Sequence, residues 1–186
     1  RFIGEWDVVT YEIRKFVSLL VKSNPNVLSL LWLDQQFYTE IDDIGRFLVE
    51  NRDIFASKRI FESFTGYAKA QLDKMKTGKH AGYMCAKRKK LVERFGYDTK
   101  SAAHAIRLLR MGTEYLKTGI LNVHRHDADE LLAIKHGEWS LGLVKLEADR
   151  LFIDAEDAYR VSNLPESPDM DAVNHLLIEL IGRSLF

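Results

Sequence analysis

The chain has 186 residues, of which 46% are hydrophobic and 29% are charged, values that are typical of a globular protein with a sizeable core. No apolar run approaches the ~18 residues that a membrane-spanning helix needs, and a single cysteine, Cys85, excludes an internal disulfide. We therefore expect no membrane segment and a reducing, cytoplasmic location. The net charge of +0 argues against a broadly basic nucleic-acid-binding protein.

The charges are unevenly distributed along the chain. Residues 74–110 contain eleven Lys or Arg against two acids, and residues 147–171 contain eight acids against two Arg. The basic segment either faces phosphate groups or packs against the acidic segment. Its densest run, Lys87-Arg88-Lys89-Lys90, is consistent with nucleic-acid contact, but the pattern favours a solvated helix face.

The first elements are expected to be a little β structure followed by helices. Residues 5–13 mix β-branched and aromatic side chains, which favours a short strand leading into a helix over 11–21. Pro25 separates that helix from the apolar run 27–33, which indicates a short buried helix, with a strand over 28–33 as the alternative.

Most of the remaining chain has the periodicity of amphipathic helices. We expect a short β-like edge at 120–123, a loop at 162–168, and helices at 44–51, 57–76, 80–94, 127–136, 140–160 and 169–182. The predicted fold class is a mainly α helical bundle with a short β remnant at the N-terminus.

The stretch 96–119 gives the clearest helix signal and the most suggestive polar face. Asp98 or Thr99 is the expected N-cap and Gly119 ends the helix, while one face carries Ala102, Ala105, Ile106, Leu109 and Leu116. On the other face, Lys100, His104 and Arg107 are spaced i, i+4 and i+7, with Glu114 two turns further on. Such a row suits a polyphosphate, but charged residues on a solvated face give the same pattern.

Other chemistry-bearing patterns are weaker. The run His124-Arg125-His126-Asp127 offers imidazoles and a carboxylate to a metal, although Arg125 opposes a cation. Two Asp-x-Asp pairs, at 127–129 and 169–171, open helices, where acids also stabilise the helix dipole. The sequence contains no glycine-rich phosphate loop.

Several blocks, in this order, resemble a family of predicted nucleotidyltransferases of the DNA polymerase β superfamily, its RNA-repair-associated branch in bacteria and phages. These blocks cover most of the chain: Asp7-Val-Val-Thr-Tyr-Glu-Ile-Arg-Lys-Phe, Asn24-Pro-Asn-Val-Leu, Leu30-Leu-Trp, Gly96-Tyr-Asp-Thr-Lys-Ser-Ala-Ala-His-Ala-Ile-Arg-Leu-Leu, Glu114-Tyr-Leu-Lys-Thr-Gly, Leu131-Leu-Ala-Ile, Gly137-Glu-Trp-Ser and Ser162-Asn-Leu-Pro-Glu-Ser-Pro-Asp.

The resemblance implies transfer of a nucleoside monophosphate from an NTP, such as ATP, to an acceptor hydroxyl on RNA, DNA or another macromolecule, with Mg²⁺. It implies that Asp7 is a catalytic carboxylate and metal ligand, and that Lys100, His104 and Arg107 bind the nucleotide. Lys100 and Arg107 would neutralise the triphosphate charge. The complete family fold is expected to be α+β.

The sequence departs from the superfamily pattern because it contains no Gly-Ser dipeptide, and its Asp-x-Asp pairs lie far downstream. We expect the catalytic sheet to precede Arg1, so that residues 1–35 end the catalytic domain and residues 36–186 form an α-helical C-terminal domain. The chain alone would then be inactive. The alternative is a non-catalytic helical module that binds nucleic acid or a protein partner through the basic 74–110 segment.

Overall fold

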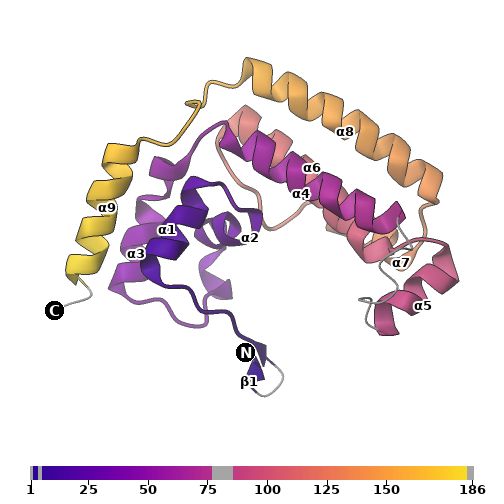
Figure 1. Cartoon of the computed structure of the whole chain (residues 1–186), viewed down its shortest axis with the longest axis horizontal. Coiled ribbons are helices and arrows are strands. Elements are labelled where there is room, and N and C mark those ends of the chain that lie inside the picture. The colour runs from indigo at the N-terminus through magenta and orange to yellow at the C-terminus, as the bar shows by residue number, and fades with distance from the viewer. Residues whose placement is uncertain (1, 4–5, 77–85, 184–186) are drawn as a thin grey trace.

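The computed structural model describes residues 2–3, 6–76 and 86–183, which form a helical bundle (Figure 1). Helices α4, α6 and α8 lie side by side, and α9 packs with α1 and α3 at one end. The predicted helical bundle is therefore confirmed. Among the described residues, no helix combines the length and the apolar character needed to cross a bilayer.

The N-terminal β structure is a two-stranded antiparallel ribbon of β1 (Phe2–Ile3) and β2 (Trp6–Asp7). Helix α1 (Ile13–Val21) follows, and Asn24 then caps the short helix α2 (Pro25–Leu28) by accepting from two backbone N–H groups. The apolar run continues as the 3₁₀ helix η1 (Ser29–Trp32), so the strand alternative for this run is wrong. A second 3₁₀ turn, η2 (Gln35–Phe37), comes next.

The middle of the chain is helical as expected. It contains α3 (Asp43–Glu50), the 3₁₀ helix η3 (Arg52–Phe55), α4 (Arg59–Lys76) and α5 (Ala86–Phe95). The predicted helix over 80–94 corresponds to α5, and its first part, 80–85, lies outside the described residues.

Helix α6 (Thr99–Thr118) is the centre of the bundle, because it packs against α4, α7 and α8. Asp98 is its N-cap and accepts from the backbone N–H groups of Lys100 and Ser101. Gly119 closes it in a left-handed conformation, with φ 72°. All five apolar residues predicted to face the core are buried: Ala102, Ala105, Ile106, Leu109 and Leu116.

Three further helices complete the chain: α7 (Ala128–His136), α8 (Leu141–Val161) and α9 (Met170–Arg183). The β-like edge expected at 120–123 is wrong, since this segment is irregular and pairs with no strand of the described chain. Its alternation reflects a loop in which Leu121 is buried while Ile120 is exposed.

Hydrogen bonds and close packing hold the end of α7 against the start of α6. The hydroxyl of Thr99 donates to the carbonyl of Lys135 (2.8 Å), and that of Tyr97 to the carbonyl of Trp139 (2.6 Å). Gly137 ends α7 with φ 82°, and a Cβ there would lie 2.2 Å from the Phe95 ring of α5. Glycine at this position therefore permits α5 and α7 to meet.

A buried ion-pair network joins α6 to α7, α8 and the segment before α7. Arg110 donates to Asp127 (2.7 Å), Glu130 and Glu147 (2.9 Å). Arg125 forms a bidentate pair with Glu114 and also donates to Asp127 (2.7 Å). Burial raises the pKa of Asp127, but the hydrogen bonds from Arg125 and Arg110 outweigh it and hold that pKa at about 2.

We predict that Arg110→Ala lowers the free energy of unfolding by about 2 kcal/mol, because it removes one of the two arginine partners of the largely buried Asp127 and Glu147. The Arg110 side chain is only 14% exposed. Denaturant unfolding of the purified chain measures the change. Arg160→Ala is the matched control, since Arg160 pairs with Glu156 at the surface and its loss should change stability by less than about 0.5 kcal/mol. Equal, small losses in both variants would contradict the prediction.

Candidate functional site

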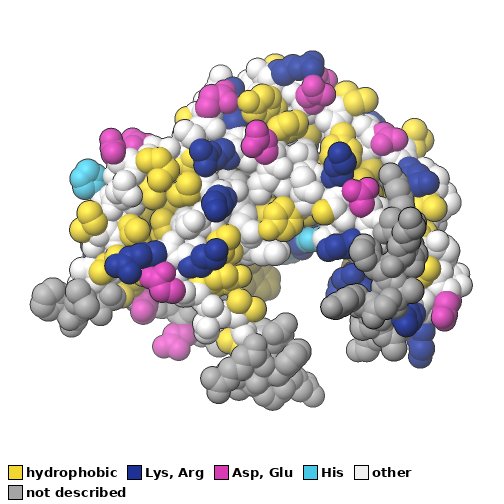
Figure 2. Space-filling view, viewed as in Figure 1, with side chains coloured by type: hydrophobic (Ala, Val, Ile, Leu, Met, Phe, Trp, Pro, Cys, Tyr) yellow, Lys and Arg dark blue, Asp and Glu magenta, His cyan; other side chains and the backbone are white. Residues whose placement is uncertain are grey.

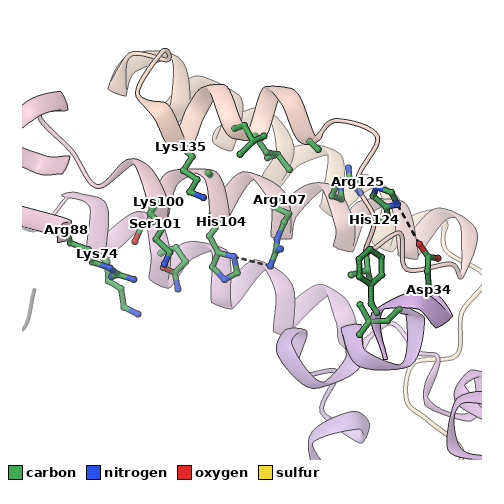
Figure 3. A pocket seen from close by; sticks show the side chains of 18 residues that line it. Asp34, Lys74, Arg88, Lys100, Ser101, His104, Arg107, His124, Arg125 and Lys135 are labelled. Atoms are coloured by element: carbon green, nitrogen blue, oxygen red, sulfur yellow. Dashed lines mark hydrogen bonds and ion pairs between the residues drawn. The ribbon is translucent and has the colours of Figure 1, made fainter. Parts of the chain in front are cut away.

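A cavity of about 790 Å³ lies along the exposed side of α6 (Figure 3). Figure 2 shows Lys and Arg side chains along one wall of a concavity on the lower side of the molecule. The cavity is lined by Leu33, Asp34, Phe37, Gln71, Lys74, Arg88, Lys100, Ser101, Ala103, His104, Arg107, Val123, His124, Arg125, Ala128, Leu131, Leu132 and Lys135. Asp34 is the single carboxylate among these described lining residues.

The polar row predicted on α6 forms one side of this cavity. Lys100, His104 and Arg107 all line it, together with Ser101. From Lys100 to Arg107 the row extends roughly 10 Å along the helix axis. Helices α4, α7 and α8 pack against the rest of α6, so this row lies on the open side of the helix, where Lys100 is exposed and His104 and Arg107 are half-buried.

Three further cations reach the same cavity from other helices. Lys74 comes from α4, Arg88 from α5 and Lys135 from α7, and Figure 3 shows them near Lys100 and Ser101. The sequence marked Lys74 and Arg88 only as members of the basic 74–110 segment, and nothing in it singled out Lys135. Arg88 also approaches the Asp98 carboxylate at 3.6 Å.

Two arginines that line the cavity differ in how their charge is balanced. Arg125 is 4% exposed, and Glu114 and Asp127 neutralise it. Arg107 has no carboxylate partner among the described residues: its guanidinium contacts His104 Nδ1 at 3.4 Å, and its buried Nε has no hydrogen-bond partner. Burial and the charge of Arg125 lower the pKa of Arg107. An anion in the cavity would supply the missing partner.

His104 is held neutral by its surroundings. Burial, followed by the positive charges of Arg107, Lys74 and Lys100, lowers the pKa of its imidazole to about 4. A neutral ring can accept from Arg107 at Nδ1 and offer its Nε2–H to a ligand oxygen. The backbone N–H groups at the start of α6 are different, because Asp98 occupies those of Lys100 and Ser101. This wall of the cavity therefore offers side-chain donors rather than these backbone N–H groups.

The other end of the cavity carries fewer unbalanced charges. Phe37 lies there because its ring contacts His124, and Leu33 and Val123 are the chain neighbours of Asp34 and His124. Arg125 also lines this end, and 3.6 Å separates the Asp34 carboxylate from His124 Nδ1. Figure 3 shows this pair at the opposite end of the cavity from Lys74 and Arg88. The sequence did not single out Phe37 or Asp34, which belong to a short 3₁₀ turn and the residue before it.

The basic segment and the acidic segment meet at only part of their lengths. Arg110 pairs with Glu147 on α8, which is the docking arrangement that the charge pattern allowed. Lys74, Arg88, Lys100 and Arg107 instead face the cavity. Glu114, two turns beyond Arg107, is committed to Arg125 and does not line the cavity.

The chain matches one known protein family over most of its length. The model of RlaP, the RNA repair pathway DNA polymerase beta family, matches residues 2–179. The chain belongs to this family. The resemblance drawn from the sequence blocks is thus confirmed, and RlaP membership indicates a DNA polymerase β-like nucleotidyltransferase group. No curated protein and no solved structure matches the chain.

Enzymes of this superfamily generally use Mg²⁺, so the described residues must be checked for side chains that could hold the ion. Within the described residues, no three His, Cys, Asp or Glu side chains are grouped as a metal site requires. Asp127 is engaged by arginines, and Asp169 accepts from two backbone N–H groups at the start of α9. Asp7 ends β2, and its side chain lies outside what the structure describes. The described residues therefore do not form a magnesium site.

We predict that the His104 ring titrates near pH 4 in the free chain and that pyrophosphate raises this pKa. At pH 7 the ring is neutral, because burial and three cations oppose its protonation. A bound anion favours the imidazolium and so moves the pKa upward. Histidine ring NMR signals followed against pH measure both values. The ring of His175, exposed on α9, serves as control and should not respond to pyrophosphate. Titration of His104 near pH 6.5 would contradict the prediction.

Proposed function

We propose that this RlaP member is a nucleotidyltransferase that binds an NTP in the cavity along α6 and transfers its nucleoside monophosphate to an acceptor hydroxyl. The observation that carries the proposal is the unbalanced positive charge of the cavity. Lys74, Arg88, Lys100, Arg107 and Lys135 line it from four helices, and Asp34 is the single carboxylate among the described lining residues.

The residue types suit a triphosphate. A guanidinium such as that of Arg107 pairs with two phosphate oxygens at once, whereas a lysine ammonium acts as a point charge. His104 adds an uncharged donor between Lys100 and Arg107. We therefore assign nucleotide binding to Lys100, His104 and Arg107, and we add Lys74, Arg88 and Lys135 as further phosphate contacts.

The chemical step is assigned to other groups. We propose that Asp7 contributes a catalytic carboxylate and a ligand for Mg²⁺, and that residues 1–35 end the catalytic domain while residues 36–186 form the helical C-terminal domain. One carboxylate does not hold the metal by itself. We expect the 186-residue chain on its own to bind NTP without turning it over.

The acceptor is proposed to be RNA. The family description names an RNA repair pathway, and an RNA end presents the hydroxyl that a nucleotidyltransferase modifies. Transfer would join the α-phosphorus of the NTP to that hydroxyl oxygen and release pyrophosphate, whose charge the lysine and arginine side chains of the cavity would balance.

We predict that Lys100→Ala weakens ATP binding about tenfold while leaving the melting temperature nearly unchanged, because a charge-assisted contact to phosphate is lost from an exposed side chain. Arg107→Gln should weaken binding at least as much. Calorimetric titration of the purified chain with ATP measures the affinity, and thermal unfolding measures stability. Lys145→Ala, an exposed lysine on α8 outside the cavity, is the matched control.

Two outcomes would count against this function. If affinity falls only in step with melting temperature, the row on α6 is structural. If the wild-type chain binds a single-stranded RNA oligonucleotide in a strongly salt-dependent way and shows no affinity for ATP, the non-catalytic module that binds through the 74–110 segment is the better description.

A further inference from the structure

The cavity along α6 is electrically and chemically asymmetric. Lys74, Arg88, Lys100 and Lys135 gather around the first turns of α6. Beyond Arg107, Figure 3 shows Arg125, His124 and Asp34, the single carboxylate of the described lining, and the Phe37 ring meets the His124 ring at this far end. Arg125 adds no net charge there, because Glu114 and Asp127 neutralise it. A ligand with charge at one end and an apolar face at the other fits this asymmetry in one direction only.

Phe37 is the most conspicuous side chain of this far end. Phe37 lines the cavity and is 56% exposed, more than any other Phe, Tyr or Trp side chain in the described part of the chain. Its ring meets the His124 ring edge to face, with 6.3 Å between centroids and an interplanar angle of 85°. This contact covers little of the ring and leaves the rest of its surface available.

We propose that Phe37 is the stacking platform for the nucleobase, so that the NTP lies along α6 with its triphosphate toward Lys100 and its base against Phe37. The inference rests on the proposed function, since it gives the orientation of a nucleotide in the same cavity. Leu33 and Val123, the chain neighbours of Asp34 and His124, supply apolar side chains beside the base. Asp34 repels phosphate from this end and thereby fixes the direction.

Stacking on a phenylalanine tolerates any base, because every base has an aromatic face. The proposal therefore predicts a gain in affinity that all four nucleotides share over their phosphate chain alone. It also predicts that this gain, and not phosphate binding, depends on the ring of residue 37.

The test compares ATP with inorganic tripolyphosphate by calorimetric titration of the 186-residue chain. Phe37→Leu keeps an apolar side chain but removes the aromatic face, and we expect it to weaken ATP binding about tenfold while tripolyphosphate binding stays as in the wild type. Phe37→Trp should bind ATP at least as tightly as the wild type. Ile178→Leu, at an exposed position on α9, is the control and should change neither affinity.

The outcomes separate this inference from the proposed function. If the wild type binds neither ATP nor tripolyphosphate, the proposed function fails. If it binds both equally well, or if Phe37→Leu leaves ATP affinity unchanged, the stacking role is overturned while phosphate binding stands. An equal loss of both affinities in Phe37→Leu would show that Phe37 supports the wall of the cavity and would also overturn the stacking role.

Discussion

The candidate site depends on the ion-pair network around Arg110 and Arg125. These two arginines tie α7, α8 and the segment before α7 to the central helix, and those elements carry Lys135, Leu132, Val123 and His124 to the cavity. The network also separates two kinds of positive charge. Arg110 and Arg125 face carboxylates and hold the bundle together, whereas Arg107 faces the cavity without a carboxylate partner among the described residues and favours binding of an anion.

The polar side chains of α6 therefore have different surroundings along the helix. Near its start, Lys100, His104 and Arg107 line the cavity, and no carboxylate neutralises Arg107 among the described residues. Further along, Arg110 and Glu114 are fully engaged in the network. A single amphipathic helix thus provides both the anchoring of its neighbours and the surface that we propose to bind the triphosphate.

The sequence predicted features that depend on neighbouring residues within one helix, and it missed residues that only the packing of separate elements brings together. The caps of α6, Asp98 and Gly119, and its buried apolar face followed from spacing and residue type, because hydrogen bonding and burial within one helix depend on nearby residues. Lys135 and Phe37 could not be linked to the cavity in this way, since only the packing of separate elements brings them there. The strand expected at 120–123 failed for the same reason: an alternating pattern forms a strand only where a partner is present to accept its hydrogen bonds.

The close approach of Gly137 to Phe95 makes residue 137 sensitive to substitution. Any side chain at residue 137 would collide with the ring that ends α5, and α5 is the helix that carries Arg88 to the cavity. Residue 137 itself lies outside the cavity lining. In a genetic screen, replacements of Gly137 would therefore behave like mutations of the proposed binding site, although residue 137 lies in a turn outside the cavity lining.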